Sequence, residues 1–501
     1  MLRQSWRVLL LLLLVPGGDS ALHGQTLPQR LSLPEAMELA RRNNPGFLAS
    51  QNDIAVADWD VRSAYGAWAP SASLSGSMAW QGQGEQVLAG ALTASQFGVT
   101  GQPDYYSSSY RAGVNWSMNG QTLFAPSQAK ASRDATAAQI NRAQIDLESQ
   151  VTRLYLDVLR QDEAVSLAGQ QLDRANFNLR LAQAQAEVGT ATLLDVRQAE
   201  VQVGRAEVAL LQSENARVTA RLRLLQQIGV DPTQEVELST TFALEEPGFR
   251  EDDLFREALD ANPSLRATRE SAEAASVGEK IARSAYFPTL SLSAGISGFA
   301  REASDPSFLI AQAQAGVARQ IASCAATNEL YSRLADPLPL LDCSQYAFTD
   351  DQRRSIIESN DAFPFDFTRS PPSASLSVSI PVFQGLSRQR NLEAARVQSQ
   401  DLRLQLRQQE LALRADLSAN LAQVRTAYAS ALIEERNQAL ADEQLRLARE
   451  RYQVGAIPFV DLVEAETVKA QADRDRVAAV YAYHDAVTNL EAAIGRPLRI
   501  R

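Results

Sequence analysis

Four short stretches of the chain alternate apolar and polar residues with a period of two, which is typical of strands with one apolar face. They cover residues 71–81, 110–118, 289–298 and 373–381. One side of each stretch is mainly Ala, Leu, Val, Ile, Met or Trp, and the other is mainly Ser or Gly. Aromatic residues stand toward the strand ends, at Trp80, Tyr110, Trp116 and Phe299. Their length and pattern match strands of a transmembrane β-barrel, although a strand of a soluble sandwich also alternates.

The rest of the pattern is helical and predicts two long hairpins, over residues 123–229 and 387–495. From Leu147 to Ala182, apolar residues recur at alternating steps of four and three, as in a coiled coil. The first long helix of the second hairpin is less regular, because Asn420, Glu434 and Gln438 occupy positions of its apolar register. We therefore expect that helix to meet different neighbours, at a polar channel wall or at a face between subunits.

The order of these elements occurs twice, which predicts two structural repeats, residues 22–232 and 233–501. Helix ends Asn44-Pro45 and Asn262-Pro263 correspond, and strand starts at 70–75 (PSASLS) and 288–293 (PTLSLS) correspond. Between the third and fourth strands lies an insert, residues 299–372, which we expect to be a loop. It contains both cysteines, Cys324 and Cys343. In an exported protein they are expected to form a disulfide, the alternative being two buried thiols.

The N-terminus predicts export. Residues 1–21 have Arg3 and Arg7 before an apolar run at 8–15 and then small residues, which is typical of a signal peptide. The alternative is a short core helix. Eight apolar residues are fewer than the roughly 20 that a spanning helix needs. We find no later apolar run of that kind, so membrane insertion is expected to use the strands.

Composition gives little sign of catalysis or of a nucleic-acid partner. The 501 residues include two His and two Cys, and the net charge of −11 contains no long run of one sign. There is no nucleophile motif, P-loop or metal-ligand spacing, so we expect no enzyme activity, no metal site and no cofactor. Four strands cannot close a barrel and an open edge does not survive in lipid, so several copies must share one barrel. The competing interpretations are a structural or adhesive coiled-coil surface protein without transport, and a soluble periplasmic scaffold.

Taken together, the chain resembles the TolC-like outer membrane factors, the outer-membrane efflux protein family. The resemblance is carried by the doubled Asn-Pro and strand-start motifs, by the doubled tips Val188-Gly189…Asp195 and Val454-Gly455…Asp461, and by the terminal 494–497 (IGRP). It implies a mainly α fold with a small β part, in a homotrimer. A twelve-stranded barrel in outer-membrane lipid would continue into a periplasmic α-helical barrel. The implied function is a passive duct for efflux or type I secretion of small molecules or proteins, with a periplasmic adaptor (membrane fusion) protein and an inner-membrane transporter.

The resemblance also assigns roles at the tips. Asp461 and Glu464 would line the periplasmic gate, and Tyr452 with its acceptor Asp195 would latch neighbouring hairpins. The simpler interpretation is that these acids cap helices. Ile457 and Leu194 stand where the best-known relative has a latch arginine and its partner, so closure is expected to rest more on apolar packing.

The turn residues Val188, Gly189, Val454 and Gly455 would dock the adaptor. We expect the two glycines to have positive φ, as residues that end helices often do.

Overall fold

The computed structural model describes residues 29–83, 87–88, 92–93, 103–336 and 338–499. The predicted signal peptide, residues 1–21, lies outside them. The fold is mainly helical with a small sheet. Contacts divide it into two units, which we describe separately. The helical unit comprises residues up to 58, 131–274 and from 400 onward, and the sheet unit comprises 59–130 and 275–399.

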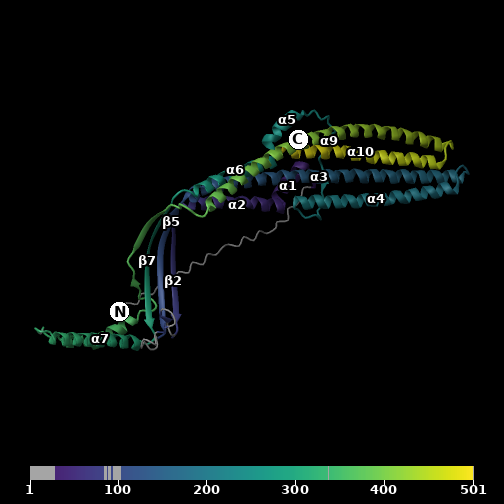
Figure 1. Cartoon of the computed structure of the whole chain (residues 1–501). Coiled ribbons are helices and arrows are strands. Elements are labelled where there is room, and N and C mark those ends of the chain that lie inside the picture. Colours follow the sequence, from purple (N-terminus) through teal and green to yellow (C-terminus); the bar gives the residue numbers. More distant parts are fainter. Residues whose placement is uncertain (1–28, 84–86, 89–91, 94–102, 337, 500–501) are drawn as a thin grey trace. The chain divides into compact units, whose positions relative to one another are not determined.

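The elements follow the duplicated order that the motifs predict, and Figure 1 labels most of them. In the first half they are β1 (Arg30–Leu31), α1 (Leu33–Asn43), α2 (Pro45–Gly66), β2 (Ser71–Gln81), β3 (Val87–Leu88), β4 (Leu92–Thr93), β5 (Tyr105–Met118), α3 (Gly120–Glu187) and α4 (Leu193–Ile228). In the second half they are β6 (Glu237–Leu238), α5 (Glu251–Ala261), α6 (Pro263–Ser284), β7 (Thr289–Ala303), α7 (Ser307–Ser332), the 3-10 helix η2 (Cys343–Tyr346), α8 (Asp350–Asn360), β8 (Thr368–Arg369), β9 (Ser373–Ser379), α9 (Ser387–Gln453) and α10 (Phe459–Ile494).

In the sheet unit, antiparallel strands lie in the order β2-β5-β7-β9, and the short β8 also pairs with β7. Leu74 is opposite Ala112, which is opposite Ile296, and Ala294 is opposite Ala374. Residues opposite one another share a face, so the apolar positions of all four strands gather on one side. We call this side the apolar face. The other, lined largely by serine, is the hydroxyl face, where Ser77 bonds Ser109 and Ser293 bonds Ser375 at 2.8 Å between hydroxyl oxygens.

The predicted boundaries of three strands were wrong, and one of these strands, β9, ends at Ser379 instead of residue 381. β5 begins at Tyr105 instead of residue 110, because residues 105–109 pair with β2 on one side and with β7 on the other. The same pairing extends β7 to Ala303. The insert is not a loop, since it folds into α7, η2 and α8. α8 starts at a capping box in which Thr349 and Gln352 bond each other's backbone, a local signal that the loop interpretation overlooked.

In the helical unit, the doubled Asn-Pro motif closes the base of each hairpin. Asn44 donates from Nδ2 to the carbonyl of Gln227 at the end of α4 (2.8 Å) and accepts the Phe47 N–H at Oδ1 (2.9 Å). Asn262 repeats both bonds, at 2.7 Å to the Ala493 carbonyl and 2.7 Å from the Leu265 N–H. One amide thus caps one helix start and satisfies an otherwise unpaired carbonyl at another helix end.

The glycines that end α4 and α10 complete these junctions. Gly229 and Gly495 have φ of 82° and 84°, a region that disfavours a side chain. A Cβ at Gly229 would lie 2.4 Å from the Asn43 carbonyl oxygen, and one at Gly495 would lie 2.7 Å from that of Ala261. The glycine in each repeat therefore lets the end of one helix approach the end of another.

His484 on α10 lies in the core of the helical unit and is 3% exposed. Its ring centroid is 5.3 Å from that of Phe242 and 5.1 Å from that of Tyr483. Burial, with the nearby positive charge of Arg499, lowers the pKa of His484 to about 4. The imidazole is therefore neutral near pH 7.

This burial predicts a pH-dependent loss of stability. Between pH 6.5 and 4 the unfolded chain binds a proton at His484 that the folded chain does not, so stability falls as pH falls. From about pH 7.5 to about pH 5, His484 should account for roughly 2 kcal/mol of the loss. Denaturant unfolding of the wild type and of His484→Gln at both pH values measures this contribution. A variant that loses as much stability as the wild type would contradict the prediction.

Candidate functional site

The hairpin tips, where the sequence places the site, lie at the same end of the helical unit (Figure 1). The α3–α4 turn contains Gly189 with φ of 80°, and the α9–α10 turn contains Gly455 with φ of 73°. Both positive φ values confirm the prediction for these glycines. The preceding residues, Val188 and Val454, are 74% and 78% exposed. Each turn therefore presents an apolar side chain to solvent.

Beneath the turns, the two hairpins meet through an apolar cluster. Tyr452 of α9 is 4% exposed, and its ring centroid lies 5.5 Å from that of Phe459 on α10. Ala182 and Val196 of the first hairpin belong to the same cluster, and Ile457 packs against it. Ile457 thus takes part in apolar contacts within the chain.

Tyr452 and Asp195 influence each other electrostatically, but no hydrogen bond joins them. The pKa of the Tyr452 hydroxyl is raised, first by burial and then by the negative charge of Asp195. This hydroxyl has no hydrogen-bond partner among the described residues. Asp195 instead accepts the N–H and the hydroxyl of Thr192 at Oδ2, both at 2.8 Å. Asp195 is therefore a capping residue in this chain, and the Tyr452 hydroxyl is left buried and unpaired among the described residues.

Asp461 and Glu464 are exposed and lie three residues apart in the first turns of α10. In the described part of the chain, no hydrogen bond or salt bridge involves either carboxylate. Their negative charges therefore face solvent without a compensating partner.

Farther from the turns, an ionic cluster of α3, α9 and α10 joins the hairpins, which sequence reasoning missed. Lys469 Nζ lies 2.5 Å from Asp473 Oδ1 and 2.8 Å from Asp442 Oδ1. From the first hairpin, Arg174 lies 3.3 Å from Glu466 and 3.8 Å from Asp473. Lys469 and Asp473 are nearly buried, at 7% and 3% exposure. The sequence signal for this cluster was the spacing of residues 466, 469 and 473, which places three charged side chains on one helical face. Such a face is usually exposed to solvent, so the pattern did not predict a buried cluster.

Two further contacts complete the cluster. Arg449 lies 2.6 Å from Glu466, and Asn178 donates to the same carboxylate at 3.1 Å. Three basic side chains thus meet three acidic ones.

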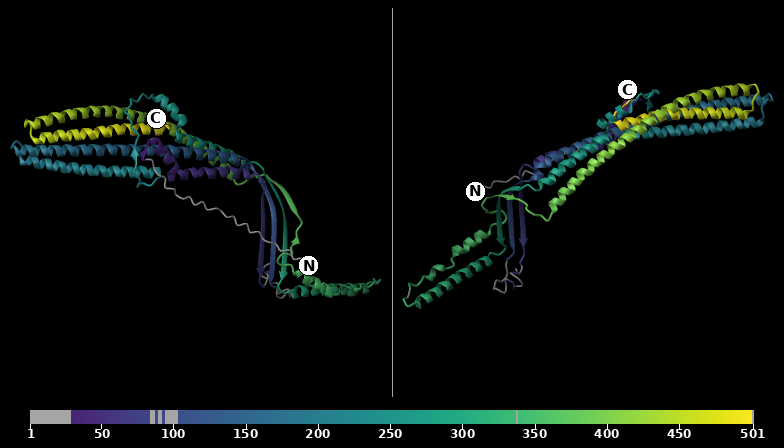
Figure 2. Two further views of the ribbon diagram at one scale, coloured as in Figure 1. Left: turned by 180° about the vertical axis from the view of Figure 1, so that it is seen from behind. Right: turned by 45° about the horizontal axis from the view of Figure 1, so that its top comes forward.

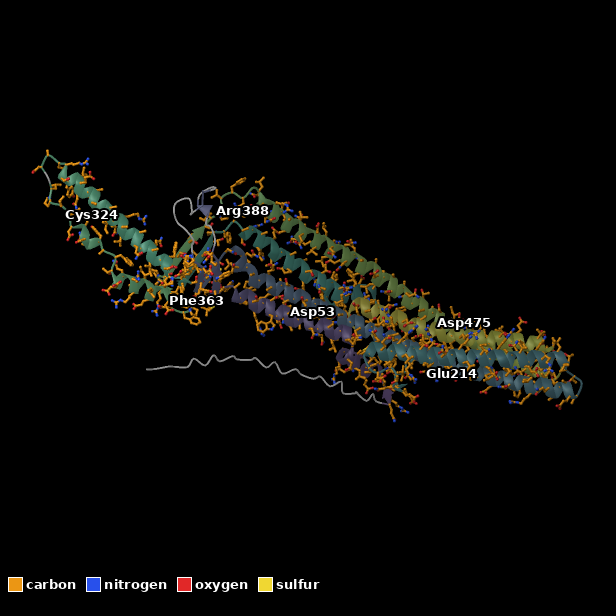
Figure 3. The ribbon with its side chains drawn as sticks, turned by 90° about the horizontal axis from the view of Figure 1, so that it is seen from below. Asp53, Glu214, Cys324, Phe363, Arg388 and Asp475 are labelled. Atoms are coloured by element: carbon orange, nitrogen blue, oxygen red, sulfur yellow. A yellow bond between two sulfur atoms is a disulfide. The ribbon has the colours of Figure 1, made fainter. Side chains whose placement is uncertain are left out.

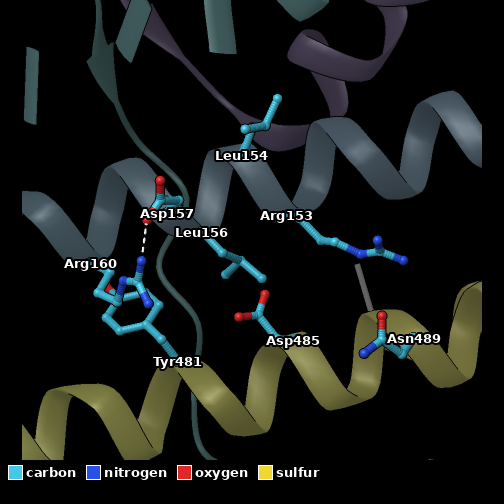
Figure 4. Close-up of a pocket in the computed structure, with 8 residues that line it drawn as sticks. All are labelled: Arg153, Leu154, Leu156, Asp157, Arg160, Tyr481, Asp485 and Asn489. Atoms are coloured by element: carbon cyan, nitrogen blue, oxygen red, sulfur yellow. Dashed lines mark hydrogen bonds and ion pairs between the residues drawn. The ribbon is translucent and has the colours of Figure 1, made fainter. Parts of the chain in front are cut away.

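A pocket of about 390 Å³ lies between α3 and α10 (Figure 4). Arg160 donates to Asp157 at 2.5 Å on its α3 side. Burial raises the pKa of the Asp485 carboxyl on the α10 side, and the positive charges of Arg160 and Arg153 oppose that shift. Arg160 and Asp157 form an ion pair, and the described lining of the pocket offers no activated nucleophile. No cluster of three or more His, Cys, Asp or Glu suited to a metal occurs within the described ranges.

The insert contains the disulfide of the chain. Cys324 on α7 is bonded to Cys343 at the start of η2, with 5.8 Å between their Cα atoms.

The profile of the family described as outer membrane efflux protein matches residues 36–230 and 254–496. The chain belongs to this family. Curated efflux relatives include the pyoverdine export outer membrane protein OpmQ of Pseudomonas aeruginosa, 31% identical over 34% of this chain and 36% of OpmQ. The outer membrane efflux protein BepC of Brucella suis is 25% identical over 55% of this chain and 58% of BepC. The fusaric acid resistance protein FusA of Burkholderia cepacia is 25% identical over 42% of this chain and 41% of FusA. The matches thus span between about a third and three fifths of these relatives.

Solved structures of efflux channels share the fold over nearly the whole chain. The outer membrane protein VceC of Vibrio cholerae matches with a TM-score of 0.66 and 17% identity, covering 93% of this chain and 97% of VceC. CusC matches with a TM-score of 0.67 and 16% identity, covering 93% of this chain and 92% of CusC. Family and fold are thus those of channel proteins. Among the described helices of this efflux family member, none is long and apolar enough to span a membrane.

The ionic cluster gives a stability prediction. Lys469→Met leaves the buried Asp473 carboxylate without its nearest cation, and should lower the free energy of unfolding by roughly 3–5 kcal/mol. The matched control is Arg446→Met on α9, which breaks exposed ion pairs with Glu443 and Glu450 and should change little. Denaturant unfolding compares the two variants. Equal effects would show that burial of the cluster is unimportant.

Proposed function

We propose that three copies of this chain form one passive outer-membrane channel, which exports small molecules or proteins across the periplasm and outer membrane. The observation that carries the proposal is the sheet, with an apolar face, a hydroxyl face and two end strands, β2 and β9, each paired on one side only in the described residues. Lipid tolerates no unpaired strand edge. Pairing β9 of one copy with β2 of the next gives a closed barrel of twelve strands, with the apolar face toward lipid and the hydroxyl face toward the pore.

The long helices support the same assembly. Each hairpin carries exposed apolar side chains in runs with a spacing of seven, the spacing of a coiled-coil contact. On α4 they are Leu194, Val201, Val208, Leu211, Val218 and Leu222, and on α9 they are Leu404, Leu411, Ile433, Leu440 and Leu447. Their partners would be the helices of neighbouring copies, which would close an α-helical barrel in the periplasm.

At the tips, the proposal assigns the gate to Asp461 and Glu464, whose unpaired carboxylates would converge from three copies. The Tyr452 hydroxyl is buried and has no hydrogen-bond partner among the described residues, and the apolar contacts of Tyr452 with Ile457 and the rest of the cluster hold the hairpins of one chain together.

The turn residues Val188, Gly189, Val454 and Gly455 would dock a periplasmic adaptor linked to an inner-membrane transporter. Exposed valines on glycine-ended turns suit an apolar contact of this kind. Relatives named for pyoverdine export and fusaric acid resistance support a small-molecule cargo.

The assembly predicts that a charge on either helical stripe disrupts the trimer. Leu211→Glu on α4 and Leu440→Glu on α9 should convert an oligomer that survives detergent without heating into monomers. Gln202→Glu, beside Val201 but on another side of α4 from the stripe, is the matched control and should leave the oligomer intact. Unheated gel electrophoresis and native mass spectrometry measure the outcome. A monomeric wild type, or intact oligomers of both leucine variants, would overturn the assembly.

The gate predicts an electrical phenotype. Asp461→Asn with Glu464→Gln should reduce cation selectivity and weaken block by trivalent cations applied from the tip side, because the negative ring is removed. Single-channel recording in planar bilayers measures both quantities. Glu207→Gln, at an exposed acid of α4, is the control and should behave as wild type. Unchanged selectivity and block in the double variant would leave both acids as helix-terminal charges. A wild type without conductance would favour the structural, non-transporting alternative.

A further inference from the structure

The insert forms a fixed helical hairpin between β7 and β9. α7 and the segment that returns from it are joined by the Cys324–Cys343 disulfide. Beside it, Asn328 on α7 donates to the Leu341 carbonyl at 2.8 Å and accepts the Leu341 N–H at 2.7 Å. The far end is thus held by a covalent bond and by two hydrogen bonds.

The near end is anchored to the end of β7. Asn360, the last residue of α8, accepts the Ala303 N–H at 2.8 Å and donates to the Ala303 carbonyl at 2.9 Å. Figure 3 shows Phe363 close to this base and Cys324 toward the far end of the hairpin.

After α8, the chain folds over the apolar face of the sheet. Ser108 of β5 donates to the Pro364 carbonyl at 2.6 Å. The ring of Phe367 lies 4.9 Å from that of Tyr110, centroid to centroid. Ser108 and Tyr110 alternate with the serines of β5 and share a face with Ala112, so the covered face is the apolar one. The hairpin therefore joins the sheet on the side opposite the hydroxyl face.

Two other contacts also place the segment after α8 on the apolar face. The Phe363 N–H bonds the Glu302 carboxylate at 3.1 Å, and the Phe363 ring lies 5.5 Å from that of Tyr106. Glu302 is opposite Tyr106, so both belong to the same face.

The far end of the hairpin exposes five leucines, which we call the leucine tip. They are Leu330, Leu334, Leu338, Leu340 and Leu341, with exposed fractions of 61%, 42%, 49%, 65% and 45%. Single exposed leucines are ordinary, but a fixed group of five marks a contact surface. Within the described residues of the chain, nothing covers it.

We propose that the leucine tip inserts into outer-leaflet lipid beside the channel. The inference rests on the proposed function, which turns the apolar face toward lipid. Tyr106, Tyr110, Phe363 and Phe367 then form the aromatic belt that such sheets place at headgroup level. From that level α7 extends across the direction of the strands (Figures 1 and 2), so the hairpin runs along the membrane surface.

The chemistry favours lipid over the other occupants. Contact with a second copy's tip across the pore is disfavoured. The base of the insert hairpin joins the sheet on the side opposite the hydroxyl face, and the hydroxyl face is the one proposed to line the pore. Acidic residues outnumber basic ones between residues 304 and 367, so attraction to anionic headgroups is not the driving force. The contact is therefore apolar, and it should form with uncharged lipid.

The test uses the full-length oxidised protein in phosphatidylcholine nanodiscs. A spin label at Leu340→Cys should collide with oxygen several-fold more, relative to a water-soluble nickel complex, than a label at Ser355→Cys. Ser355 is an exposed polar residue of α8 in the same hairpin and serves as the control. Mass spectrometry verifies that the native disulfide remains closed and that one thiol is labelled. Equal nickel accessibility at the two positions would overturn the proposal, as would dipolar broadening between Leu340 labels of different copies.

A second variant separates lipid contact from a plug. Leu338→Ser combined with Leu340→Ser and Leu341→Ser should leave single-channel conductance and the oligomer unchanged, because the tip lies outside the pore. A conductance increase would mean that the hairpin blocks the mouth, which contradicts the inference. The two proposals fail differently. A wild type without oligomer and conductance refutes the channel, whereas a conducting channel with a water-exposed tip refutes only the lipid contact.

Discussion

Unpaired strand edges are the constraint on which this structure depends. The chain has four long strands whose register gathers apolar side chains on one face, yet β2 and β9 are edges among the described residues. In water such edges invite other strands, and in lipid their unpaired peptide groups cost several kcal/mol each. A single copy therefore leaves both edges without a partner among the described residues. The helices have a comparable unpaired surface, because the apolar stripes on α4 and α9 are exposed in the single chain. The proposed assembly, in which each copy completes the next, would resolve both.

The duplicated junctions explain how the chain fixes the ends of its long helices. Asn44 and Asn262 each serve two helix ends, and Gly229 and Gly495 each allow an approach that a Cβ would block. Hydrogen bonds of this type contribute about 1 kcal/mol each, so their value lies in geometry as much as in stability. Each junction sets where a hairpin begins and ends, and thereby which residues reach its tip.

Local periodicity predicted most of the fold, because strands, long helices and tip glycines each follow from nearby residues. The helical pattern located both hairpins, and the Val-Gly motifs located Gly189 and Gly455. Features that depend on the packing of distant segments could not be predicted from nearby residues. The Ser-rich start of β5 became a strand only because β2 and β7 flank it. Lys469 and Asp473 look like surface charges in sequence, and only the packing of α3 against α9 and α10 buries them. For the same reason, the gate role proposed for Asp461 and Glu464 would depend on copies that one chain does not contain.

The contacts between the two hairpins differ in kind along their length, and this has consequences for how the tips behave. Near the turns, Tyr452 and Phe459 pack in an apolar cluster, whose energy depends little on exact geometry. Farther along, Arg174, Glu466, Lys469 and Asp473 form directional ion pairs with low exposure, which are lost steeply when one partner moves or is removed. A small shift of the tips therefore costs less than the same shift at the ionic cluster. We therefore expect the hairpins to be held most rigidly at the ionic cluster, with the end that bears the acids the freer of the two.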